Sequence, residues 1–474
     1  MGYALVFFPL AMASLLLAVP SNRLRPWLLP PTGAIHLALF AATVAGGRYT
    51  CGSWLALDPP GRLVLGVSSL LFFLCSFYAV GYLRHRSERR NRVFCACLAA
   101  MLGVTSLVAW SRHLGLMWVA MEATTLVTAP LIYFNRNARS IEATWKYLMI
   151  CSVGIALALL GSFFLAYASL REGLSYSLLF DDLLRQAPRL SEPWLHAAFV
   201  LVLVGYGTKM GLAPMHTWKP DAYGEAPGVV GALLAGCMAN CGFLAILRIF
   251  QVCRAAGDAE YARTMLLGLG FASMGAAAVF LARQKDLKRM LAYSSVEHMG
   301  ILAVGLGLGG AGTFGALLHL VNNGLTKGVL FLSAGNLHRA YGSKRTDEVR
   351  GAFVRLPATA GLFLAGFLAI AGSPPFGPFL SKLTILDAAV SQGSFVAAGL
   401  FTALLVAVFV GMASTVLTAV QGTPPEPARS SGYRDRALTV LPIVVALGLV
   451  LLLGVYLPPP LEALLREAAR FVEA

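Results

Sequence analysis

Charge is scarce in this 474-residue sequence, because only 12% of its residues are Asp, Glu, Lys or Arg. A soluble globular domain carries about 25% charged residues. Apolar residues make up 58% of the chain, and the mean hydropathy is +0.72. Most side chains must therefore face lipid or one another, which excludes an ordinary soluble protein.

Motifs for metal and nucleotide chemistry are also missing. The sequence has no CxxC, CxxH or haem-attachment pattern, so an iron–sulfur or zinc site is not expected. No GxGxxG follows a strand pattern, and neither GxxxxGKS nor GxxxxGKT occurs. We therefore expect no cofactor in this chain and interpret the cysteines as small apolar residues that pack in the interior. They are Cys51, Cys75, Cys95, Cys97, Cys151, Cys237, Cys241 and Cys253.

Long apolar runs are separated by clusters of charge, Pro and Gly. A transmembrane helix needs about 20 mainly apolar residues, and the runs predict an all-α polytopic membrane protein with about fourteen spans. The first run has no basic segment before it, so it is interpreted as a retained span rather than a cleaved signal. Residues 461–474 are amphipathic, which predicts a surface helix. The predicted spans are residues 3–19, 32–46, 63–83, 93–110, 114–134, 147–169, 194–214, 228–251, 264–282, 291–308, 312–337, 357–391 with a break, 395–420 and 437–457.

The basic residues indicate how these spans are oriented. Loops after odd-numbered spans hold more than twice as many Lys and Arg as the other loops, and residues 84–92 form the densest cluster. Cytoplasmic loops of membrane proteins carry this excess. The pattern predicts a bacterial or archaeal plasma membrane protein with both termini outside. It also explains the net charge of +15 without nucleic acid as a partner.

Five charged residues nevertheless fall inside predicted spans. A charge at mid-bilayer costs roughly 2.5 to 3.5 kcal/mol on the most lenient scale, so unneeded ones should be absent. Five imply a cost on the order of 10 kcal/mol unless pairing or internal water offsets it. We interpret them as proton-carrying residues, and the alternative for any one of them is a position in a loop. They are Glu122, Lys209, Glu297, Lys327 and Lys382.

One span adds a polar stripe to its lysine. His319, Asn323 and Lys327 recur four residues apart, so a helix would stack them along one face about 12 Å long. Such a stripe can hold a file of water, and the presence of His and Lys favours a proton relay. The alternative is hydrogen bonding between neighbouring helices.

Two spans contain helix-breaking residues beside their lysines. Gly211 and Pro214 follow Lys209, and several Gly and Pro residues precede Lys382. Discontinuous helices at corresponding positions indicate inverted repeats in transporters. Nearly the same number of residues separates the two lysines as separates the two intramembrane glutamates. The predicted organisation is three spans in 1–92, a first five-helix repeat in 93–251, a second, inverted repeat in 262–421, and a last span with the amphipathic tail in 422–474.

Several segments resemble one known superfamily. The run GTKMGLAPMHTWKPDAYGEAPGVVGALLAG (207–236), with HLVNNGLTKGVLFLSAGNL and SPPFGPFLSK downstream, resembles the proton-translocating antiporter-like subunits of respiratory complex I, Mrp cation/proton antiporters and membrane-bound hydrogenases. Within that superfamily, WKYLMICSVGIALALLGSFFL (145–165) and LAYSSVEHMGI (291–301) look most like component F of hydrogenase-4 and formate hydrogenlyase complexes. The resemblance covers nearly the whole chain.

The resemblance implies a role for each intramembrane charge. Glu122 and Lys209 would form an ion pair. Lys327 would relay protons with His319 nearby, and Lys382 would act near the exit. The resemblance also implies that hydride, quinone and metal chemistry belongs to other subunits. This chain would then be a transducer within a membrane oxidoreductase complex.

One position departs from the family pattern. Many members have a lysine where LLAGCMANCGFL places Asn240, and an amide orients water but cannot hold a proton. His319 or Glu297 would then bridge the gap. Glu142, beside a predicted cytoplasmic helix end, is either an interfacial coupling residue or a solvated charge. The secondary relay or coupling candidates are Asn240, Glu297, His298, Asn323, Glu142 and His216, and the loop residues His216, Asp221 and Glu225 are alternatively structural caps of the broken helix.

These observations predict a proton-translocating subunit of a complex I-like energy-converting oxidoreductase of the hydrogenase-4 or formate hydrogenlyase type. Protons would enter from the cytoplasm near Lys209, pass the Asn240 region and leave through Lys382. The expected partners are other membrane and peripheral subunits, the lipid bilayer and protons, or sodium instead. The alternatives are a cation/proton antiporter subunit, a proton-coupled membrane partner of an inorganic-carbon uptake complex, and a scaffold with vestigial charges.

Overall fold

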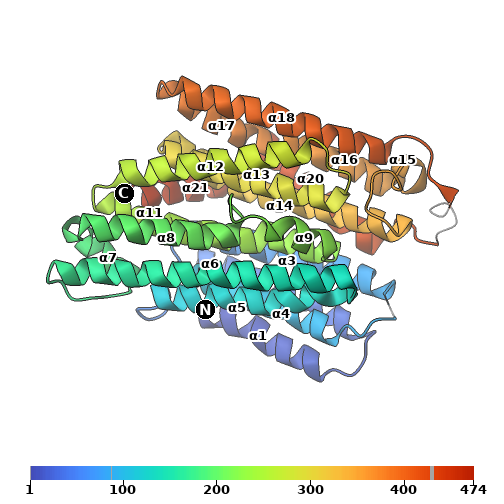
Figure 1. The fold of residues 1–474 in the computed structure, drawn as a ribbon. Coiled ribbons are helices and arrows are strands. Elements are labelled where there is room, and N and C mark those ends of the chain that lie inside the picture. The colour runs from blue at the N-terminus through green and yellow to red at the C-terminus, as the bar shows by residue number, and fades with distance from the viewer. Residues whose placement is uncertain (1, 48, 87, 427–431) are drawn as a thin grey trace.

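A computed structural model describes residues 2–47, 49–86, 88–426 and 432–474. Its described secondary structure is helical apart from isolated bridges, which confirms the all-α prediction. The long helices lie side by side (Figure 1). The helices are α1 (Gly2–Ala18), α2 (Leu29–Ala45), α3 (Pro59–Arg84), α4 (Arg92–Trp110), α5 (Leu114–Ile132), α6 (Ala138–Arg171), α7 (Phe180–Gln186), α8 (Glu192–Met210), α9 (Trp218–Glu225), α10 (Gly228–Leu233), α11 (Ala239–Ala255), α12 (Ala259–Leu281), α13 (Leu287–Leu308), α14 (Ala311–Tyr341), α15 (Ala352–Arg355), α16 (Pro357–Ala371), α17 (Gly377–Ser391), α18 (Phe395–Val420), α20 (Ala437–Val455) and α21 (Pro459–Glu473).

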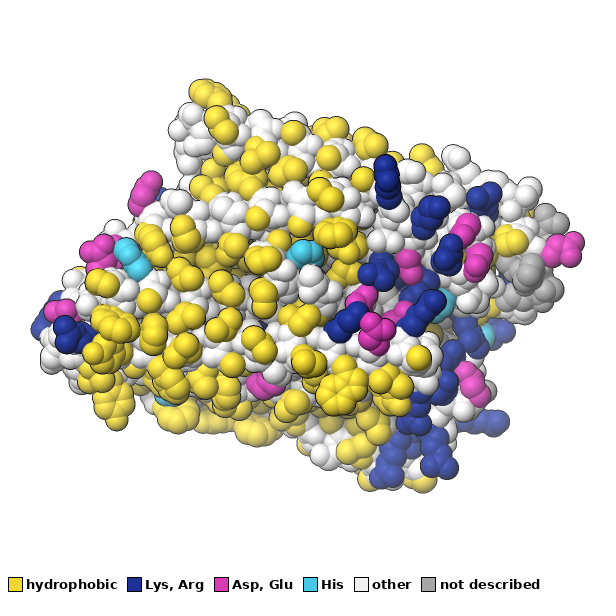
Figure 2. Space-filling model, in the orientation of Figure 1, with side chains coloured by type: hydrophobic (Ala, Val, Ile, Leu, Met, Phe, Trp, Pro, Cys, Tyr) yellow, Lys and Arg dark blue, Asp and Glu magenta, His cyan; other side chains and the backbone are white. Residues whose placement is uncertain are grey.

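The outside of the bundle is apolar along its length. Among the described residues, 10 helices are long and apolar enough to cross a membrane, and α1 and α16 are shorter apolar helices. Every predicted span falls on a helix, although the number of crossings stays a prediction. Figure 2 shows apolar side chains over the flank and most visible Lys and Arg at one end. This distribution fits a multi-pass membrane protein.

Both predicted helix breaks are present, and each begins with the same backbone motif. Gly211 ends α8 with φ of 89°, and Gly372 ends α16 with φ of 93°. At each end the next residue donates its N–H five residues back, from Leu212 to Gly207 at 2.8 Å and from Ser373 to Leu368 at 3.0 Å. This pattern closes a helix and requires a residue that tolerates positive φ. Glycine therefore fixes where both helices stop.

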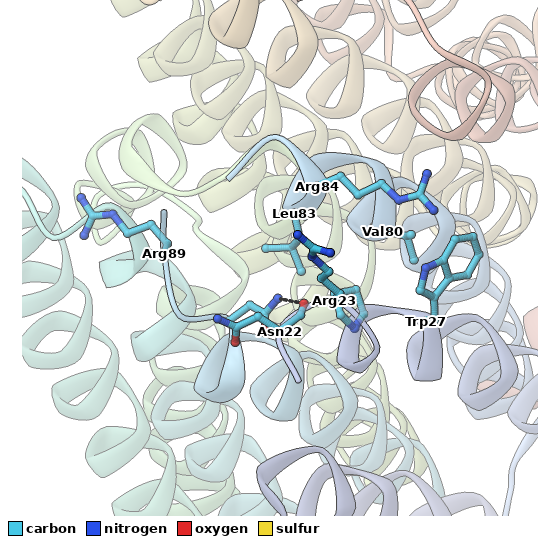
Figure 3. Close-up of a pocket in the computed structure, with 9 residues that line it drawn as sticks. Asn22, Arg23, Trp27, Val80, Leu83, Arg84 and Arg89 are labelled. Atoms are coloured by element: carbon cyan, nitrogen blue, oxygen red, sulfur yellow. Dashed lines mark hydrogen bonds between the residues drawn. The ribbon is translucent and has the colours of Figure 1, made fainter. Parts of the chain in front are cut away.

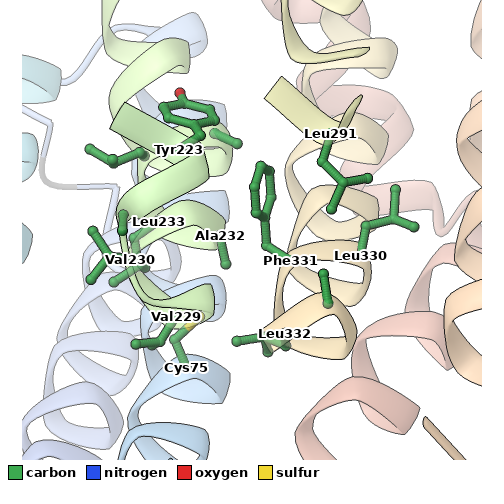
Figure 4. Close-up of a cluster of buried hydrophobic side chains, with 14 of the residues drawn as sticks. Cys75, Tyr223, Val229, Val230, Ala232, Leu233, Leu291, Leu330, Phe331 and Leu332 are labelled. Atoms are coloured by element: carbon green, nitrogen blue, oxygen red, sulfur yellow. The ribbon is translucent and has the colours of Figure 1, made fainter. Parts of the chain in front are cut away.

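The segment after the first break packs against the second half of the chain. Figure 4 shows Val229, Ala232 and neighbouring side chains facing Phe331 and Leu332 of α14. The rings of Tyr223 and Phe331 lie 5.5 Å apart, and the region is fully buried. Cys75 and Cys237 belong to the same buried cluster, and across the chain all eight cysteines are free and six are buried, as expected of small apolar residues. The short helices α9 and α10 thus connect the two halves.

The C-terminal tail forms the amphipathic helix α21 and packs on one end of the bundle. Its apolar residues Leu465, Ala468 and Val472 are buried against α3, α11 and α14. Glu473 accepts hydrogen bonds from Arg254 at 2.6 Å and from Arg263 at 2.9 Å. The tail therefore covers the helix ends on this side of the protein.

A buried ion cluster near that end joins three parts of the chain. Asp58, at the start of α3, accepts hydrogen bonds from Arg248 of α11 at 2.8 and 3.1 Å. It also accepts from Arg112 at 2.9 Å and caps α3 through the N–H of Gly61 at 2.8 Å. Because Arg248 is almost completely buried, removal of the carboxylate would leave it without a carboxylate partner in the described chain, whereas Arg112 would keep Asp181 at 2.5 Å.

We expect Asp58→Ala to destabilise the protein by about 3 to 5 kcal/mol, the usual cost of breaking a buried pair. The measurement is thermal and denaturant unfolding of the purified protein in detergent. The control is Asp347→Ala, because Asp347 pairs with Arg345 at the surface, where its hydrogen bond to that guanidinium lowers the pKa of the carboxyl to about 2. Equal loss of stability in the two variants would contradict the assignment of Asp58 as a structural centre.

Candidate functional site: a buried relay of lysines, glutamates and histidines

The first cluster lies between α5, α6 and α8. Lys209 is completely buried, and its Nζ donates to Thr125 Oγ1 at 2.6 Å and to the Tyr147 hydroxyl at 3.1 Å. Glu122 is half-buried and accepts from Ser152 Oγ at 2.9 Å. One turn of α5 separates Glu122 from Thr125, so both face the same neighbours.

The expected direct ion pair between Glu122 and Lys209 is absent. No contact within 4.0 Å joins these two described residues, and Thr125 stands between them instead. Its hydroxyl accepts from Lys209 and donates to Glu122 Oε2 at 3.3 Å. The ion pair that the resemblance implies therefore takes the form of a bridge through Thr125 in this structure. The two charges are coupled through a neutral hydroxyl.

The second cluster holds Lys327 between α13 and α14. Lys327 is completely buried, and its Nζ donates to Ser294 Oγ at 2.8 Å and to the Leu291 carbonyl at 3.4 Å. Ser294 is three residues before Glu297 on α13, so the hydroxyl and the carboxylate lie on neighbouring turns. The lysine is thus held by neutral acceptors, like Lys209.

The third cluster joins α13, α14 and α17. Lys382 Nζ lies 3.8 Å from Glu297 Oε1, and the other oxygen of that carboxylate lies 3.6 Å from His298 Nε2. His298 Nδ1 is 2.8 Å from His319 Nε2, and His319 Nδ1 is 2.8 Å from Ser381 Oγ. The structure therefore places four sequence-predicted residues in one continuous set of contacts.

The polar stripe of α14 faces the interior. His319, Asn323 and Lys327 are all completely buried. Among the described residues, the side-chain amides of Asn322 and Asn323 and the Asn240 Oδ1 have no hydrogen-bond partner. An unpaired buried polar group costs about 1 to 3 kcal/mol, so native proteins normally satisfy such groups with protein or water. The amides mark the space between the lysine clusters as polar.

Asn240 lies at this polar space, beside an irregular turn. Residues Leu234–Met238 form a π-helical turn directly before it, and Asn240 Nδ2 donates back to the Gly236 carbonyl at 2.8 Å. Such turns are frequent at functional sites because they reorient the following side chains. The same amide nitrogen would be 3.5 Å from a Cβ on Gly324 of α14, so α11 and α14 approach closely here.

Lys219 is a buried residue that sequence reasoning missed. It is completely buried, and its Nζ donates to the Met210 carbonyl at 2.6 Å and to Ser295 Oγ at 3.2 Å. In the sequence it follows a predicted span and precedes Asp221, which is typical of a solvated loop. Only the return of α9 into the bundle buries it. The one signal available in the sequence was that no carboxylate stands three or four residues from Lys219, where it could pair with the lysine on a helix.

The remaining candidates lie outside the buried clusters. Glu142 is exposed and pairs with Lys146 at 2.6 Å, and Lys146 also pairs with Asp221 at 3.0 Å. His216 is buried beside the rings of Phe280 and Tyr293. A third ion pair joins Glu225 to Lys344 at 2.6 Å. These contacts tie α9 to α6 and to the segment after α14.

Potential metal ligands meet elsewhere in the described part of the chain. Glu192, His196 and Asp258 place one donor atom each within 4.8 Å of one another. His196 Nε2 is 3.4 Å from Asp258 Oδ1, and its ring stacks on Tyr261 at 3.9 Å. An ordinary His–Asp interaction accounts for this geometry, which lies at the opposite end of α8 from Lys209.

Comparison with known proteins identifies the family. Residues 111–407 match the model of the family described as NADH:quinone oxidoreductase/Mrp antiporter, transmembrane. This chain belongs to that family. The match includes Glu122, Lys209, Glu297, Lys327 and Lys382.

Relatives agree with this placement over nearly the whole length. A hydrogenase-4 component F homolog from Methylacidiphilum infernorum is 33% identical over 473 residues, which cover 96% of each chain. The Mrp complex of Dietzia sp. DQ12-45-1b contains a chain of similar fold, with a TM-score of 0.87, 20% identity and coverage of 99% of this chain and 96% of that one. Respiratory complex I from Thermus thermophilus contains another, with a TM-score of 0.80, 24% identity and coverage of 96% and 97%. The superfamily resemblance and the membrane fold are thus confirmed.

The position of Lys219 yields a test of its packing. A Cβ on Gly211 would lie 2.5 Å from Lys219 Cδ, and the φ of 89° strains any L-residue by roughly 1 to 2 kcal/mol. We therefore expect Gly211→Ala to lower the unfolding temperature. The control is Gly268→Ala on α12, where a Cβ would meet nothing within 4 Å and Ala favours the helix. Equal unfolding temperatures for the two variants would disprove this packing.

Proposed function

We propose that this chain is the proton-translocating antiporter-like subunit of a complex I-like energy-converting oxidoreductase, of the hydrogenase-4 or formate hydrogenlyase type. The observation that carries the proposal is the set of buried titratable groups between Glu122 and Lys382. Membership of the antiporter family and the 33% identity to a hydrogenase-4 component F homolog support the choice of complex.

The contacts suggest the order in which a proton meets these groups. Glu122, Thr125 and Lys209 form the first station. Lys327 and the unpaired amides of α14 form the second. The Glu297, His298 and His319 cluster around Lys382 forms the third. Transfer from the cytoplasm near Lys209 to the outside through Lys382 would follow this order.

The interaction energy of a single charge pair is large enough to move one proton across the membrane. Moving a charge across about 200 mV costs roughly 4.6 kcal/mol. Two opposite charges brought to about 4 Å gain about 4 kcal/mol at an effective dielectric constant of about 20. A shift of Glu122 from the hydroxyl-bridged arrangement into direct contact with Lys209 would change the energy of the protonated amine by a similar amount.

The driving movement has to come from partner subunits in this proposal. Glu122 is half-buried, and its helix neighbours Val119 and Leu126 are exposed on the same side of the bundle. The ion pairs between Glu142, Lys146 and Asp221 connect the exposed start of α6 to the broken helix. A partner that moves either surface would act on the first station. The basic end would face the cytoplasm of a bacterial or archaeal cell, with both termini outside.

A cation/proton antiporter subunit is the second candidate, because the fold also matches a chain of an Mrp complex. Proton movement that requires sodium and proceeds without electron transfer would favour this candidate over the first.

Lys209→Ala tests the proposed function. In inverted membrane vesicles that contain the whole complex, we expect it to abolish proton uptake, followed with a pH-sensitive dye, because the first station loses its proton carrier. Electron transfer and subunit assembly should remain. The control is Lys285→Ala, which removes an exposed lysine from the loop before α13.

A hydroxyl variant sharpens this test. Thr125→Val removes the bridge between Glu122 and Lys209 and should slow uptake, whereas Thr124→Val, next to it on α5, should not. Full uptake in the Lys209→Ala variant would refute the proposed function.

A further inference from the structure

The proposed relay has a gap between Lys209 and Lys327. The contacts of Lys209 lie on α5 and α6, whereas those of Lys327 lie on α13. Asn240 lies where α11 approaches Gly324 of α14. Its side chain is an amide that bonds to its own helix, so it cannot accept and release a proton.

Lys219 lies at the junction of these two clusters. Its Nζ contacts the carbonyl of Met210, the residue after Lys209, and the hydroxyl of Ser295. The residue before Ser295 on α13 is Ser294, whose hydroxyl accepts from Lys327 at 2.8 Å. Hydroxyls of two consecutive residues of one helix therefore hold the two lysines. No other described lysine contacts both halves of the relay in this way.

Contacts of Tyr147 and Trp218 connect the surroundings of Lys209 to α9, the helix that carries Lys219. Tyr147 accepts from Lys209 at 3.1 Å, and its ring lies 5.0 Å from that of Trp218. Trp218 donates to the Thr208 carbonyl at 2.9 Å, which fixes α9 against the end of α8. Lys219 follows Trp218 directly, so its amine is held at the level where α8 stops.

The second broken helix contains a lysine in the same local arrangement. Lys382 Nζ donates to the carbonyls of Ile370 and Ala371 at 2.9 and 3.2 Å, at the end of α16. A Cβ on Gly372 would lie 3.1 Å from Lys382 Cδ, as one on Gly211 would lie 2.5 Å from Lys219 Cδ. Both lysines thus follow a break and bind the carbonyl end of the preceding half-helix. The local counterpart of Lys382 is Lys219, whereas Lys209 precedes its break.

We propose that Lys219 carries the proton between Lys209 and Lys327, at the place where Asn240 leaves the relay without a titratable group. This inference rests on the proposed function. In each transfer a neutral Lys327 amine receives, through water in the polar space, the proton that the Ser295 hydroxyl releases as its oxygen takes one proton from the Lys219 ammonium, which leaves Lys219 as a neutral amine. The neutral amine then takes a proton from the Lys209 side. One proton moves, and no electrons are exchanged.

A purely structural role is the competing explanation, because a lysine at a helix end stabilises the terminal carbonyls. Substitutions that keep a hydrogen-bond donor separate the two roles. Arginine keeps the donor and the charge but does not release its proton in proteins, and glutamine keeps a donor without a titratable group.

The experiment measures proton uptake in inverted vesicles that hold the complete complex. We expect Lys219→Arg and Lys219→Gln to reduce uptake to background while unfolding temperature and subunit assembly stay near those of the unmodified complex. A structural cap predicts the opposite pattern, in which both variants retain uptake. Retained uptake in both, together with loss of uptake in Lys209→Ala, would overturn the role of Lys219 and leave the proposed function intact.

A second substitution tests whether loss of uptake in Lys219→Gln comes from the missing titratable group or from a folding defect. Asn240 lies two residues before Gly242, where a Cβ would meet Met210 at 3.1 Å, and it faces Gly324 of α14. We expect Asn240→Lys to restore uptake to the Lys219→Gln variant, because it returns a titratable group to the same gap. Failure of rescue with an assembled, stable complex would overturn the proposal. No uptake in the unmodified complex would instead refute the proposed function itself.

A separate inference concerns a pocket of about 550 Å³ at the basic end of the bundle. Figure 3 shows Arg84 beside Trp27, and Arg23 and Leu83 on the adjoining wall. The guanidinium of Arg84 lies 4.9 Å from the Trp27 ring centroid. Residues that line the pocket are Asn22, Arg23, Pro26, Trp27, Val80, Leu83, Arg84, Arg89 and Asn91.

No carboxylate in the described part of the chain balances the charges of Arg23 and Arg84. None of the pocket's described lining residues is acidic, and neither Arg23 nor Arg84 pairs with a described carboxylate. Trp27 and the buried side chains of Val80 and Leu83, near the end of α3, supply the apolar part of the pocket lining. Exposed tryptophan is typical of the membrane–water interface, and basic pockets between helices bind lipid headgroups there.

We infer that this pocket binds the phosphate headgroup of an anionic phospholipid. The arginines would contact the phosphate oxygens, and an acyl chain would follow the apolar part of the lining. None of the residues that line the pocket belongs to the relay, so the inference does not depend on proton transport.

Lipid-dependent unfolding of the purified, delipidated protein tests this site. We expect phosphatidylglycerol to raise the unfolding temperature by several degrees more than phosphatidylcholine with the same acyl chains. Arg23→Gln/Arg84→Gln should abolish the difference. The control Arg139→Gln/Arg283→Gln, which removes two exposed arginines outside the pocket, should preserve it.

Three results would overturn the lipid site. Equal shifts with both lipids would show that the headgroup charge is not recognised. An equal shift with inorganic phosphate would assign the pocket to a free anion. Loss of a co-purifying subunit in the double variant, with the lipid effect unchanged, would assign the arginines to a protein interface.

Discussion

Buried amines that are held by neutral oxygen atoms are the constraint on which this structure depends. Lys209, Lys219 and Lys327 are all fully buried, and each donates to hydroxyls, to a backbone carbonyl or to both. A carboxylate in direct contact would fix the charged form of the amine. Hydroxyls and carbonyls satisfy the hydrogen-bonding requirement of the amine more weakly, so they do not fix its charged form in this way. Among these lysines and Lys382, as the structure describes them, Lys382 alone has a carboxylate oxygen within 4.0 Å, that of Glu297 at 3.8 Å.

The helix breaks supply several of these oxygen atoms. An α-helix leaves its last four carbonyls without internal partners, and a buried helix end must satisfy them. At Met210 and Ile370 a lysine from beyond the break donates to those carbonyls. Glycine at Gly211 and Gly372 both ends the helix and leaves room for the lysine side chain. The same feature thus stops the helix and positions a cation inside the membrane.

The sequence was informative about those features that burial in lipid fixes without help from the tertiary structure. Scarce charge and long apolar runs were enough for the membrane fold, and the Gly and Pro clusters located both breaks. Glu297, His319, Lys327 and Lys382 stood out because charge and imidazole are costly within apolar segments. The structure then brought Glu297, His319 and Lys382 together, although they come from three different helices.

Contacts between helices were beyond the reach of the sequence. The hydroxyl of Thr125 between Glu122 and Lys209 is set by how α5 packs on α8. Lys219 has the local sequence of a solvated loop, and it is buried only because α9 turns back into the bundle.

The sequence by itself thus determined that the protein lies in a lipid bilayer, that it is helical and which types of titratable residue it places there. These features follow from the free energy of transferring each segment from water to lipid. The tertiary structure decided which groups touch, because that depends on how segments far apart in the chain pack.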